Sequence, residues 1–457
     1  MKLQRPAWLT SIDALAGILI IVLILLIGLV IFTGTQLGIR VSTNFQDGVG
    51  PFGPLRLKFS SPVVAAKVEP LLSIDPITTG RYEWPNAQTV QFIPSQPLKA
   101  NTTYKLILQA GSIGQSGELL KKKQSWTLHF RSPLIAYLAA SKQTTDLWVV
   151  DMNGHSPHRL MQLPYSSIEF DASPNGEFLI LSVFNKQSGI DLWQVNRDGS
   201  NAHLLVGCGA GRCTTPAISP DSSQVAYTSE AAPLTPGGIP GAPRIMVFNL
   251  QTQQNRPLFA DSQMIGYYPI WSPDGMKVSS YDGINGAIRV VTISTGAQVS
   301  FPTVIGTTVA SWSPDSSSLL FTDIQQTPDG NRTVINQADF ASGQISTLFG
   351  PHDDRDYYYD SLAWLPTGDR VLIGLRPSAN SAAEALWLVN PDMQAGQMIV
   401  DQANMIFQSP HWDPWGNALV FEELKLGGPP QTQIALWMPG FDQPRTLATG
   451  FSPHWLP

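Results

Sequence analysis

An unbroken run of apolar residues near the N-terminus is the strongest pattern in the chain. From Ala14 to Phe32 all 19 residues are apolar or glycine. A helix rises about 1.5 Å per residue, so such a run just crosses a hydrocarbon core of about 30 Å. Lys2 and Arg5 precede it, which favours a cytoplasmic N-terminus. We therefore expect residues 1–35 to form a cytoplasmic stub and a transmembrane anchor.

This anchor predicts a single-pass protein of the cell membrane whose later domains are extracytoplasmic. A cleaved signal peptide is the alternative, but it usually has a shorter apolar region followed by small residues. Phe32-Thr33-Gly34 offers no such cleavage site. A buried core helix is the other alternative, and the absence of a polar face argues against it.

Short stretches in which apolar and polar residues alternate follow a Gly-, Thr- and Pro-rich linker, residues 36–54. An alternation with a period of two predicts half-buried strands. These short strands and the turn-rich segments between them predict a β-sandwich over residues 55–132. The predicted strands are Leu55–Phe59, Thr89–Ile93, Tyr104–Leu108 and Trp126–Phe130.

Four stretches of this region carry a resemblance to a known family. They are Phe59-Ser60-Ser61-Pro62-Val63, Phe92-Ile93-Pro94, the residues from Leu98 to Tyr104, and Leu128-His129-Phe130. The region resembles the bacterial Ig-like domains of cell-surface and S-layer proteins. Ser61 departs from the family, which more often has an acidic residue there. The resemblance implies a spacer or adhesion module without catalysis.

From residue 134 onward a tetrapeptide with proline in second place recurs. Successive prolines, from Pro174 to Pro457, lie 46, 53, 41, 52, 48 and 43 residues apart. Periods near 40–50 residues with about four strands each are typical of β-propeller blades. The copies are Ser173–Gly176, Ser219–Ser222, Ser272–Gly275 and Ser313–Ser316, then the degenerate Leu365–Gly368 and Asp413–Gly416.

The two ends of the repeat complement each other. Residues 134–163 supply three strands without a first strand, and residues 450–457 supply a first strand with nothing after it. Joined, they complete one blade and leave no long free edge. This predicts an all-β chain that ends in a seven-bladed propeller closed by its C-terminal strand. Six blades is the alternative, if the unit around Pro366 is an insertion.

A tryptophan often stands two residues before the repeat proline, as in Tyr268-Pro269-Ile270-Trp271-Ser272-Pro273-Asp274-Gly275. Residues 133–457 resemble the propeller of TolB-type proteins, which are related to WD-repeat propellers. The resemblance implies the fold. That scaffold serves as an interaction platform, a periplasmic assembly factor or the gating domain of some peptidases, so it leaves function open.

Composition narrows the function classes. Charged residues make up 14% of the chain and the net charge is −6, so no basic footprint for nucleic acid is present. No nucleophile elbow, Walker A loop, zincin motif or dinucleotide fingerprint appears, and we expect no cofactor. Two cysteines, Cys208 and Cys213, exclude a four-cysteine zinc site. In an oxidising exterior they predict a disulfide, with a metal site or a reactive thiol pair as the less favoured alternative.

The connections after the second and fourth strands of each blade contain all the long loops: Ala231–Pro243, Gln325–Arg332, Gly350–Asp360 and Gly427–Gln431. Length variation confined to one face marks it as the recognition face. Its richest segment has tyrosines among charges, as interface anchors do, whereas the alternative is a solvated loop whose tyrosines pack on the blade rim. The candidate binding residues there are Asp353, Asp354, Asp356, Tyr357, Tyr358 and Tyr359.

A second candidate site comes from aligning the first strands of the blades. Three residues before the repeat proline stand Asp171, His411 and His454, which belong to consecutive blades around the ring. Two imidazoles and a carboxylate in one place suit a divalent metal, an anionic ligand or acid–base chemistry. The alternative is that the histidines cap strands and satisfy backbone groups. We assign no metal to them.

These features favour a membrane-anchored, extracytoplasmic binding or scaffold protein. Its propeller face would recognise an envelope protein, a peptide or a glycan. The alternative is an extracytoplasmic hydrolase or lyase with a site over the propeller channel, around Asp171, His411 and His454.

Overall fold

The chain divides into two compact units, Met1–Phe130 and Arg131–Pro457. Each is described by itself, and the finer division at residues 35 and 54 stays a prediction. The computed structural model describes residues 16–27, 38–43, 55–94, 98–99, 102–128, 130, 132–141, 143–163, 165–235, 238–261, 263–304, 310–328, 330–350, 358–376, 384–392, 395–427 and 431–457.

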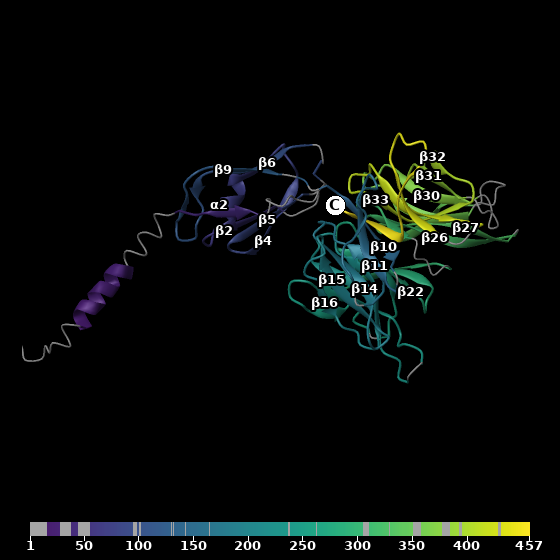
Figure 1. Ribbon diagram of the computed structural model, residues 1–457, viewed down its shortest axis with the longest axis horizontal. Coiled ribbons are helices and arrows are strands. Elements are labelled where there is room, and N and C mark those ends of the chain that lie inside the picture. The colour runs from purple at the N-terminus through teal and green to yellow at the C-terminus, as the bar shows by residue number, and fades with distance from the viewer. Residues whose placement is uncertain are drawn as a thin grey trace, which may run out of the picture. The chain divides into compact units, whose positions relative to one another are not determined.

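The prediction of an N-terminal transmembrane helix is wrong for the described residues. Of this region the structure describes residues 16–27, which are helical and purple in Figure 1. In the part of the chain that the structure describes, no helix is long and apolar enough to cross a membrane.

The first unit packs two antiparallel sheets over one core. The larger sheet has the strand order β1-β2-β5-β4 and the smaller has β3-β6-β9, while β7 and β8 form a hairpin. The strands are β1 Val41–Thr43, β2 Leu55–Phe59, β3 Leu72–Asp75, β4 Gly80–Asn86, β5 Thr89–Pro94, β6 Tyr104–Leu108, β7 Gly111–Ser112, β8 Leu119–Leu120 and β9 Gln124–Leu128. The short helices are α2 Ala65–Val68 and the 3₁₀ helix η1 Glu69–Leu71.

Alternation along the strands builds this core. In β2, Leu55, Leu57 and Phe59 are buried and the two residues between them are exposed. Successive side chains of a strand point to opposite faces, so β2 gives its apolar side to the core. The two sheets share that core, which matches the sandwich that the alternation predicts. That this sandwich is an Ig-like domain stays a prediction. Strand β1 lies within residues 36–54, which were expected to form a linker.

Within the described part of the second unit the strands form seven blades. Blade 1 has the order β12-β11-β10-β37, and blades 2 to 7 each use four consecutive strands. One parallel bridge between Ile190 and Arg212 joins blades 2 and 3. The unit around Pro366 is a full blade, so the count is seven and not six.

The strands of blades 1 to 3 are β10 Leu134–Ala140, β11 Thr145–Asp151, β12 His158–Arg159, β13 Ser167–Ala172, β14 Phe178–Phe184, β15 Ile190–Asn196, β16 His203–Val206, β17 Arg212–Ile218, β18 Gln224–Glu230, β19 Arg244–Asn249 and β20 Asn255–Pro257. Those of blades 4 and 5 are β21 Tyr267–Trp271, β22 Lys277–Asp282, β23 Ala287–Thr292, β24 Gln298–Pro302, β25 Ala310–Trp312, β26 Ser318–Thr327, β27 Gly330–Asp339 and β28 Gln344–Phe349. Those of blades 6 and 7, with the closing strand, are β29 Tyr358–Trp364, β30 Val371–Arg376, β31 Ala385–Val389, β32 Gly396–Asp401, β33 Met405–Trp412, β34 Leu419–Lys425, β35 Thr432–Trp437, β36 Arg445–Thr449 and β37 Phe451–Leu456.

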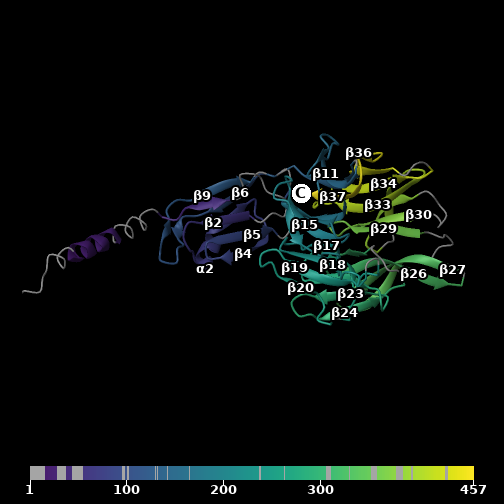
Figure 2. The ribbon, with the colours of Figure 1, turned by 60° about the horizontal axis from the view of Figure 1, so that its bottom comes forward.

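Seven hydrophobic clusters, counted over the described residues, fill the spaces between neighbouring blades. A four-stranded sheet cannot cover both of its own faces, whereas packed neighbours can. The clusters join blades 1 and 2 (Ala136 with Phe170), 2 and 3 (Ile180 with Val225), 3 and 4 (Val247 with Val278), 4 and 5 (Val290 with Trp312), 5 and 6 (Leu320 with Val371), 6 and 7 (Leu386 with Phe421), and 7 and 1 (Val420 with Ile135). Because the last cluster returns to blade 1, the blades form a closed ring (Figure 2).

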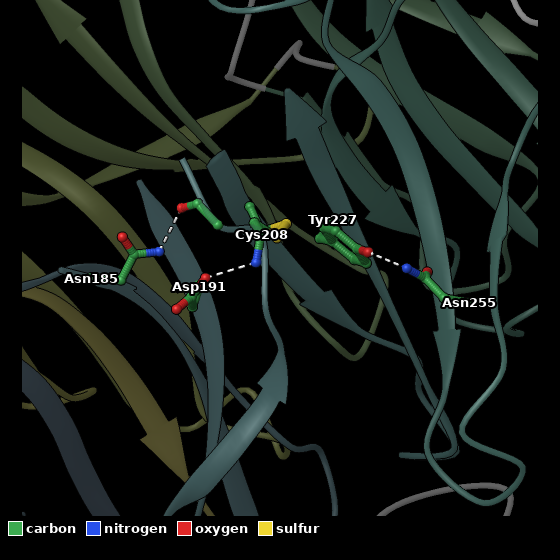
Figure 3. The surroundings of a disulfide bond; sticks show 7 residues. Asn185, Asp191, Cys208, Tyr227 and Asn255 are labelled. Atoms are coloured by element: carbon green, nitrogen blue, oxygen red, sulfur yellow. Dashed lines mark hydrogen bonds between the residues drawn. A yellow bond between two sulfur atoms is a disulfide. The ribbon is translucent and has the colours of Figure 1, made fainter. Parts of the chain in front are cut away.

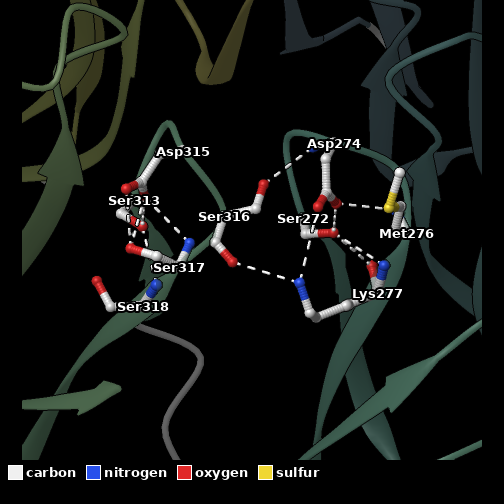
Figure 4. Close-up of polar contacts among 9 residues, drawn as sticks. All are labelled: Ser272, Asp274, Met276, Lys277, Ser313, Asp315, Ser316, Ser317 and Ser318. Carbon is white, nitrogen blue, oxygen red and sulfur yellow. Dashed lines mark hydrogen bonds and ion pairs between the residues drawn. The ribbon is translucent and has the colours of Figure 1, made fainter. Parts of the chain in front are cut away.

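The repeated tetrapeptide forms the turn between the first and second strands of a blade. In blade 4 the Gly275 N–H donates to the Ser272 carbonyl at 2.8 Å, and the Lys277 N–H donates to Ser272 Oγ at 2.9 Å (Figure 4). The fourth residue has a positive φ, 69° at Gly275 and 60° at Ser316. The Asp274 N–H donates to Ser316 Oγ at 3.0 Å, which ties the turns of blades 4 and 5 together.

In blades 4, 5 and 1 the tryptophan two residues before the proline donates a hydrogen bond to the blade before it. Trp271 Nε1 donates to the Ala217 carbonyl at 2.9 Å, and Trp312 Nε1 donates to Ser279 Oγ at 3.2 Å. Trp455 Nε1 donates to the His411 carbonyl at 2.9 Å. These three tryptophans combine a large apolar surface with a hydrogen bond between blades.

Candidate functional site

The strand order gives the propeller two unlike faces. The first strand of every blade from 2 to 7 ends at the repeated turn, so these turns share one face, which we call the turn face. The connections after the second and fourth strands lie at the opposite end, which we call the loop face. Consecutive antiparallel strands require this alternation.

The structure brings Asp171, His411 and His454 together. They lie near the ends of β13, β33 and β37, close to the turn face, in blades 2, 7 and 1. The two imidazole rings have centroids 4.0 Å apart at 36° to each other. His454 Nδ1 lies 3.5 Å from Asp171 Oδ1, and the Phe170 ring packs against His454.

The Asp171 carboxylate already has backbone partners. The N–H of Ala172 donates to Oδ1 at 2.8 Å, and the N–H of Ile218 in blade 3 donates to Oδ2 at 2.7 Å. Asp171 therefore holds the first strands of blades 2 and 3 together. The carboxylate thus has a structural role in this part of the ring.

Burial decides the charge of the cluster. It raises the pKa of Asp171 to about 7 and lowers the pKa of His411 to about 4. Burial, with the nearby His411, holds the pKa of His454 well below 6.5. The side chains of His454 and Asp171 remain 20% and 24% exposed. At neutral pH both imidazoles are therefore uncharged, and the carboxyl group carries a proton part of the time.

Among the described residues, no group of three or more His, Cys, Asp or Glu side chains could hold a metal ion. The two imidazoles can donate and accept hydrogen bonds and exchange protons. A general acid or base must reach the reacting atom of a substrate, and nothing described here supplies that geometry.

Sequence reasoning missed a second set of carboxylates near the axis. The N–H of Thr215 in β17 donates to Glu169 of blade 2, and the N–H of Ser452 in β37 donates to Glu422 of blade 7. Burial raises the pKa of Glu169. Both donors have positive φ at register shifts of their strands, 50° and 51°. A proline follows each of them, which is the sequence signal for such a bulge.

The tyrosine-rich candidate segment is only partly visible. Asp353, Asp354, Asp356 and Tyr357 lie outside the described residues. Tyr358 contributes backbone to β29, and its side chain is not described. Tyr359 is buried and packs edge-on against Phe349, with centroids 4.9 Å apart. Tyr359 is thus a core residue of the interface between blades 5 and 6.

One expected loop is not a loop. Gln325 and Arg332 are paired residues of the long hairpin formed by β26 and β27. Their side chains are polar, because the strand pairing here extends beyond the core. Since their backbone groups pair with each other, the hairpin needs no buried side chain at this point.

Exposed hydrophobic side chains gather on the loop face, and sequence reasoning did not single them out. Six of the nine exposed large hydrophobic residues in the described propeller lie in loop-face connections or at strand ends there. Met276 follows a turn on the opposite face, and two more lie on outer strands. The loop-face residues are Phe184, Leu234, Ile239, Tyr268, Ile284 and Val304.

Cys208 and Cys213 form a disulfide at the connection from blade 2 to blade 3, as predicted (Figure 3). Neighbouring side chains hold this connection. Asn185 Nδ2 donates to the Gly209 carbonyl at 2.8 Å, and the Cys208 N–H donates to Asp191 Oδ1 at 2.7 Å. The disulfide-bonded loop is therefore held by Asn185, which follows β14, and by Asp191 of β15.

Solved structures share this architecture. No family model and no curated protein matches the chain. A prolyl endopeptidase structure matches with a TM-score of 0.52 at 12% identity, covering 70% of this chain and 50% of that one. A puromycin-hydrolyzing peptidase from Mycobacterium tuberculosis matches with a TM-score of 0.50 at 15% identity, covering 69% and 53%. The fold is a β-propeller.

TolB from Acinetobacter baumannii is also similar, at 13% identity over 85% of this chain and 83% of that one, with a TM-score of 0.42. Identities this low show the fold alone. They leave the partner and any activity to be argued from this chain's own residues.

We predict that His411→Gln flattens the acid dependence of stability. An ordinary histidine has a pKa of 6.5, whereas burial lowers that of His411 to about 4, so the unfolded chain binds more protons between these values. The stability that neutral His411 contributes is present above pH 6.5 and is lost as the pH falls toward 4. The raised pKa of Asp171 changes the pH dependence of stability in the opposite direction. For this reason the pH dependence of the parent is compared with that of His411→Gln, which keeps Asp171.

Denaturant unfolding of the parent and of His411→Gln between pH 6.5 and 4.5 measures this difference. The unfolding free energy of the parent should fall more steeply with falling pH, by up to about 1.4 kcal/mol per pH unit. Equal slopes in the two proteins would show that His411 is not a buried neutral imidazole.

Proposed function

We propose that this protein is an extracytoplasmic binding protein that recognises its partner with the loop face of the propeller. The observation that carries the proposal is the gathering of exposed hydrophobic side chains on that face. Exposed apolar side chains that share one region of a surface mark interaction sites. Among an envelope protein, a peptide and a glycan, such side chains favour a protein partner.

The contrast between the faces supports this assignment. The turn face is built from short, nearly identical turns whose polar groups bond to one another within and between blades. Long connections such as Ala231–Pro243 are confined to the loop face, where sequence can vary without disturbing the blades.

We do not propose the hydrolase or lyase alternative. It rests on Asp171, His411 and His454, which lie toward the turn face. Both oxygens of the Asp171 carboxylate accept backbone hydrogen bonds. The cluster has an evident structural role between blades 7, 1, 2 and 3.

The disulfide supports the extracytoplasmic part of the proposal. Disulfides persist in oxidising compartments and are rare where glutathione and thioredoxin keep thiols reduced. The bond between Cys208 and Cys213 involves every cysteine of the chain.

We predict that the natural protein has no reactive thiol. Cells are quenched with acid, the chain is denatured, and a maleimide of large mass is added with or without prior reduction. The expected result is no added tag without reduction and two tags after it, since both cysteines are bonded. Two tags without reduction would contradict an oxidising location.

We predict that the partner contacts the loop face. A photo-crosslinking amino acid replaces Ile284 on the loop face in one full-length variant and Met276 on the turn face in another. The two side chains are matched in exposure, 67% and 63%. Irradiation in the native cells, followed by gel analysis, should give a discrete protein adduct from position 284 and none from position 276. Adducts from position 276 alone would refute the proposal.

A further inference from the structure

The connection between β18 and β19 is the projecting element of the loop face. Ser229 and Arg244 are still paired across the two strands. Just beyond them the Gly241 N–H donates to the Ala231 carbonyl at 2.9 Å. The chain therefore leaves blade 3 and returns to it through a narrow neck, as compact surface loops do. We call the described residues of this connection, 231–235 and 238–243, the neck loop.

Two aliphatic side chains of the neck loop face solvent. Leu234 is fully exposed and Ile239 is 91% exposed, the highest values among the large hydrophobic residues of the described propeller. Exposure of an aliphatic side chain to water is energetically unfavourable, and the neck loop does not fold these two side chains back onto blade 3. They become buried only when another molecule covers them.

The neighbours of these side chains along the chain indicate what that molecule is. Pro233 precedes Leu234 and Pro240 follows Ile239. Proline fixes its own φ and restricts the residue before it, so less backbone entropy is lost on binding. Proline beside an aliphatic residue is the pair that aromatic-lined grooves of recognition domains accept.

The lack of charged side chains in the neck loop restricts the chemistry of the partner's groove further. The described residues of the neck loop contain no charged side chain, in a chain with a net charge of −6. A groove lined by acidic or basic groups would lose their hydration and find no counter-charge on the loop. A complementary groove is therefore uncharged as well as apolar.

The adjacent blade continues this surface. Tyr268, Ile284 and Val304 of blade 4 are exposed at the same face, and blades 3 and 4 share one hydrophobic cluster. Further exposed apolar side chains therefore lie on the same face as the neck loop.

We propose that the neck loop is the docking element of this protein, which inserts Leu234 and Ile239 into an uncharged, aromatic-lined groove of a partner protein. This inference rests on the proposed function, because it names the part of the loop face that binds and the chemistry of the partner.

Photo-crosslinking in the native cells tests the inference with the full-length chain. A photoreactive amino acid replaces Leu234, and the adduct is digested and mapped by mass spectrometry. The expected adduct joins position 234 to one protein, through a segment of that protein that contains Trp, Tyr or Phe. Adding Ile239→Asp should lower the adduct yield at least about tenfold, since it removes the second anchor and buries a charge.

A matched substitution controls for non-specific effects of charge. Met276→Asp introduces the same charge at an exposed hydrophobic residue of the turn face and should leave the adduct yield unchanged. Ile239→Ser provides a neutral second variant with the same expected direction. The unfolding midpoints of all variants should equal that of the parent, because each altered side chain is exposed.

The outcomes separate the inference from the function on which it rests. An adduct from position 284 without one from position 234 would overturn the docking role of the neck loop and leave the loop face as the binding face. Adducts from neither position would overturn both. Adducts only to lipid, or to a partner segment without aromatic residues, would overturn the proposed partner chemistry.

Discussion

Closure of the ring by its last strand is the constraint on which the other features depend. β37 pairs antiparallel with β10, with Leu134 opposite Leu456 and Ile135 opposite Trp455 (Figure 1). The guanidinium group of Arg197 in blade 2 fixes the strand end: Nη1 donates to the Leu456 and Pro457 carbonyls at 2.8 and 2.6 Å. Residues more than 300 apart in sequence thus share one sheet, and the entropy of closing so long a loop is offset only when the clusters on both sides form.

The same closure produces the polar cluster and separates the two faces. His454 belongs to the closing strand, His411 to the blade before it and Asp171 to the blade after it. The cluster therefore exists only in the closed ring, where burial keeps both imidazoles uncharged. Exposed apolar residues lie at the other end of the blades, where connections are free to lengthen. Under the proposed function, stability and recognition therefore depend on different faces.

Much of the fold follows from local patterns, whereas surface chemistry does not. The repeated turns predicted the blades because a proline and a residue with positive φ fix each turn locally. The alignment of first strands placed Asp171, His411 and His454 together because the blades repeat. Tyr359 was predicted to be part of a binding loop, whereas it is buried. Its burial depends on Phe349 of the neighbouring blade, and no local sequence pattern shows that contact. The exposure of Leu234 and Ile239 was missed because apolar residues are by default expected in the protein interior.

Hydrogen exchange of the propeller with and without residues 451–457 tests the closed ring most directly. If β37 completes blade 1, the shortened chain loses protection at the amides of β10 and in both flanking clusters, around Phe170 and Val420, and its unfolding midpoint falls. If instead the shortened chain keeps the protection pattern and the unfolding midpoint of the full chain, the tail does not hold the ring. The account given for the seam and for both faces would then be wrong.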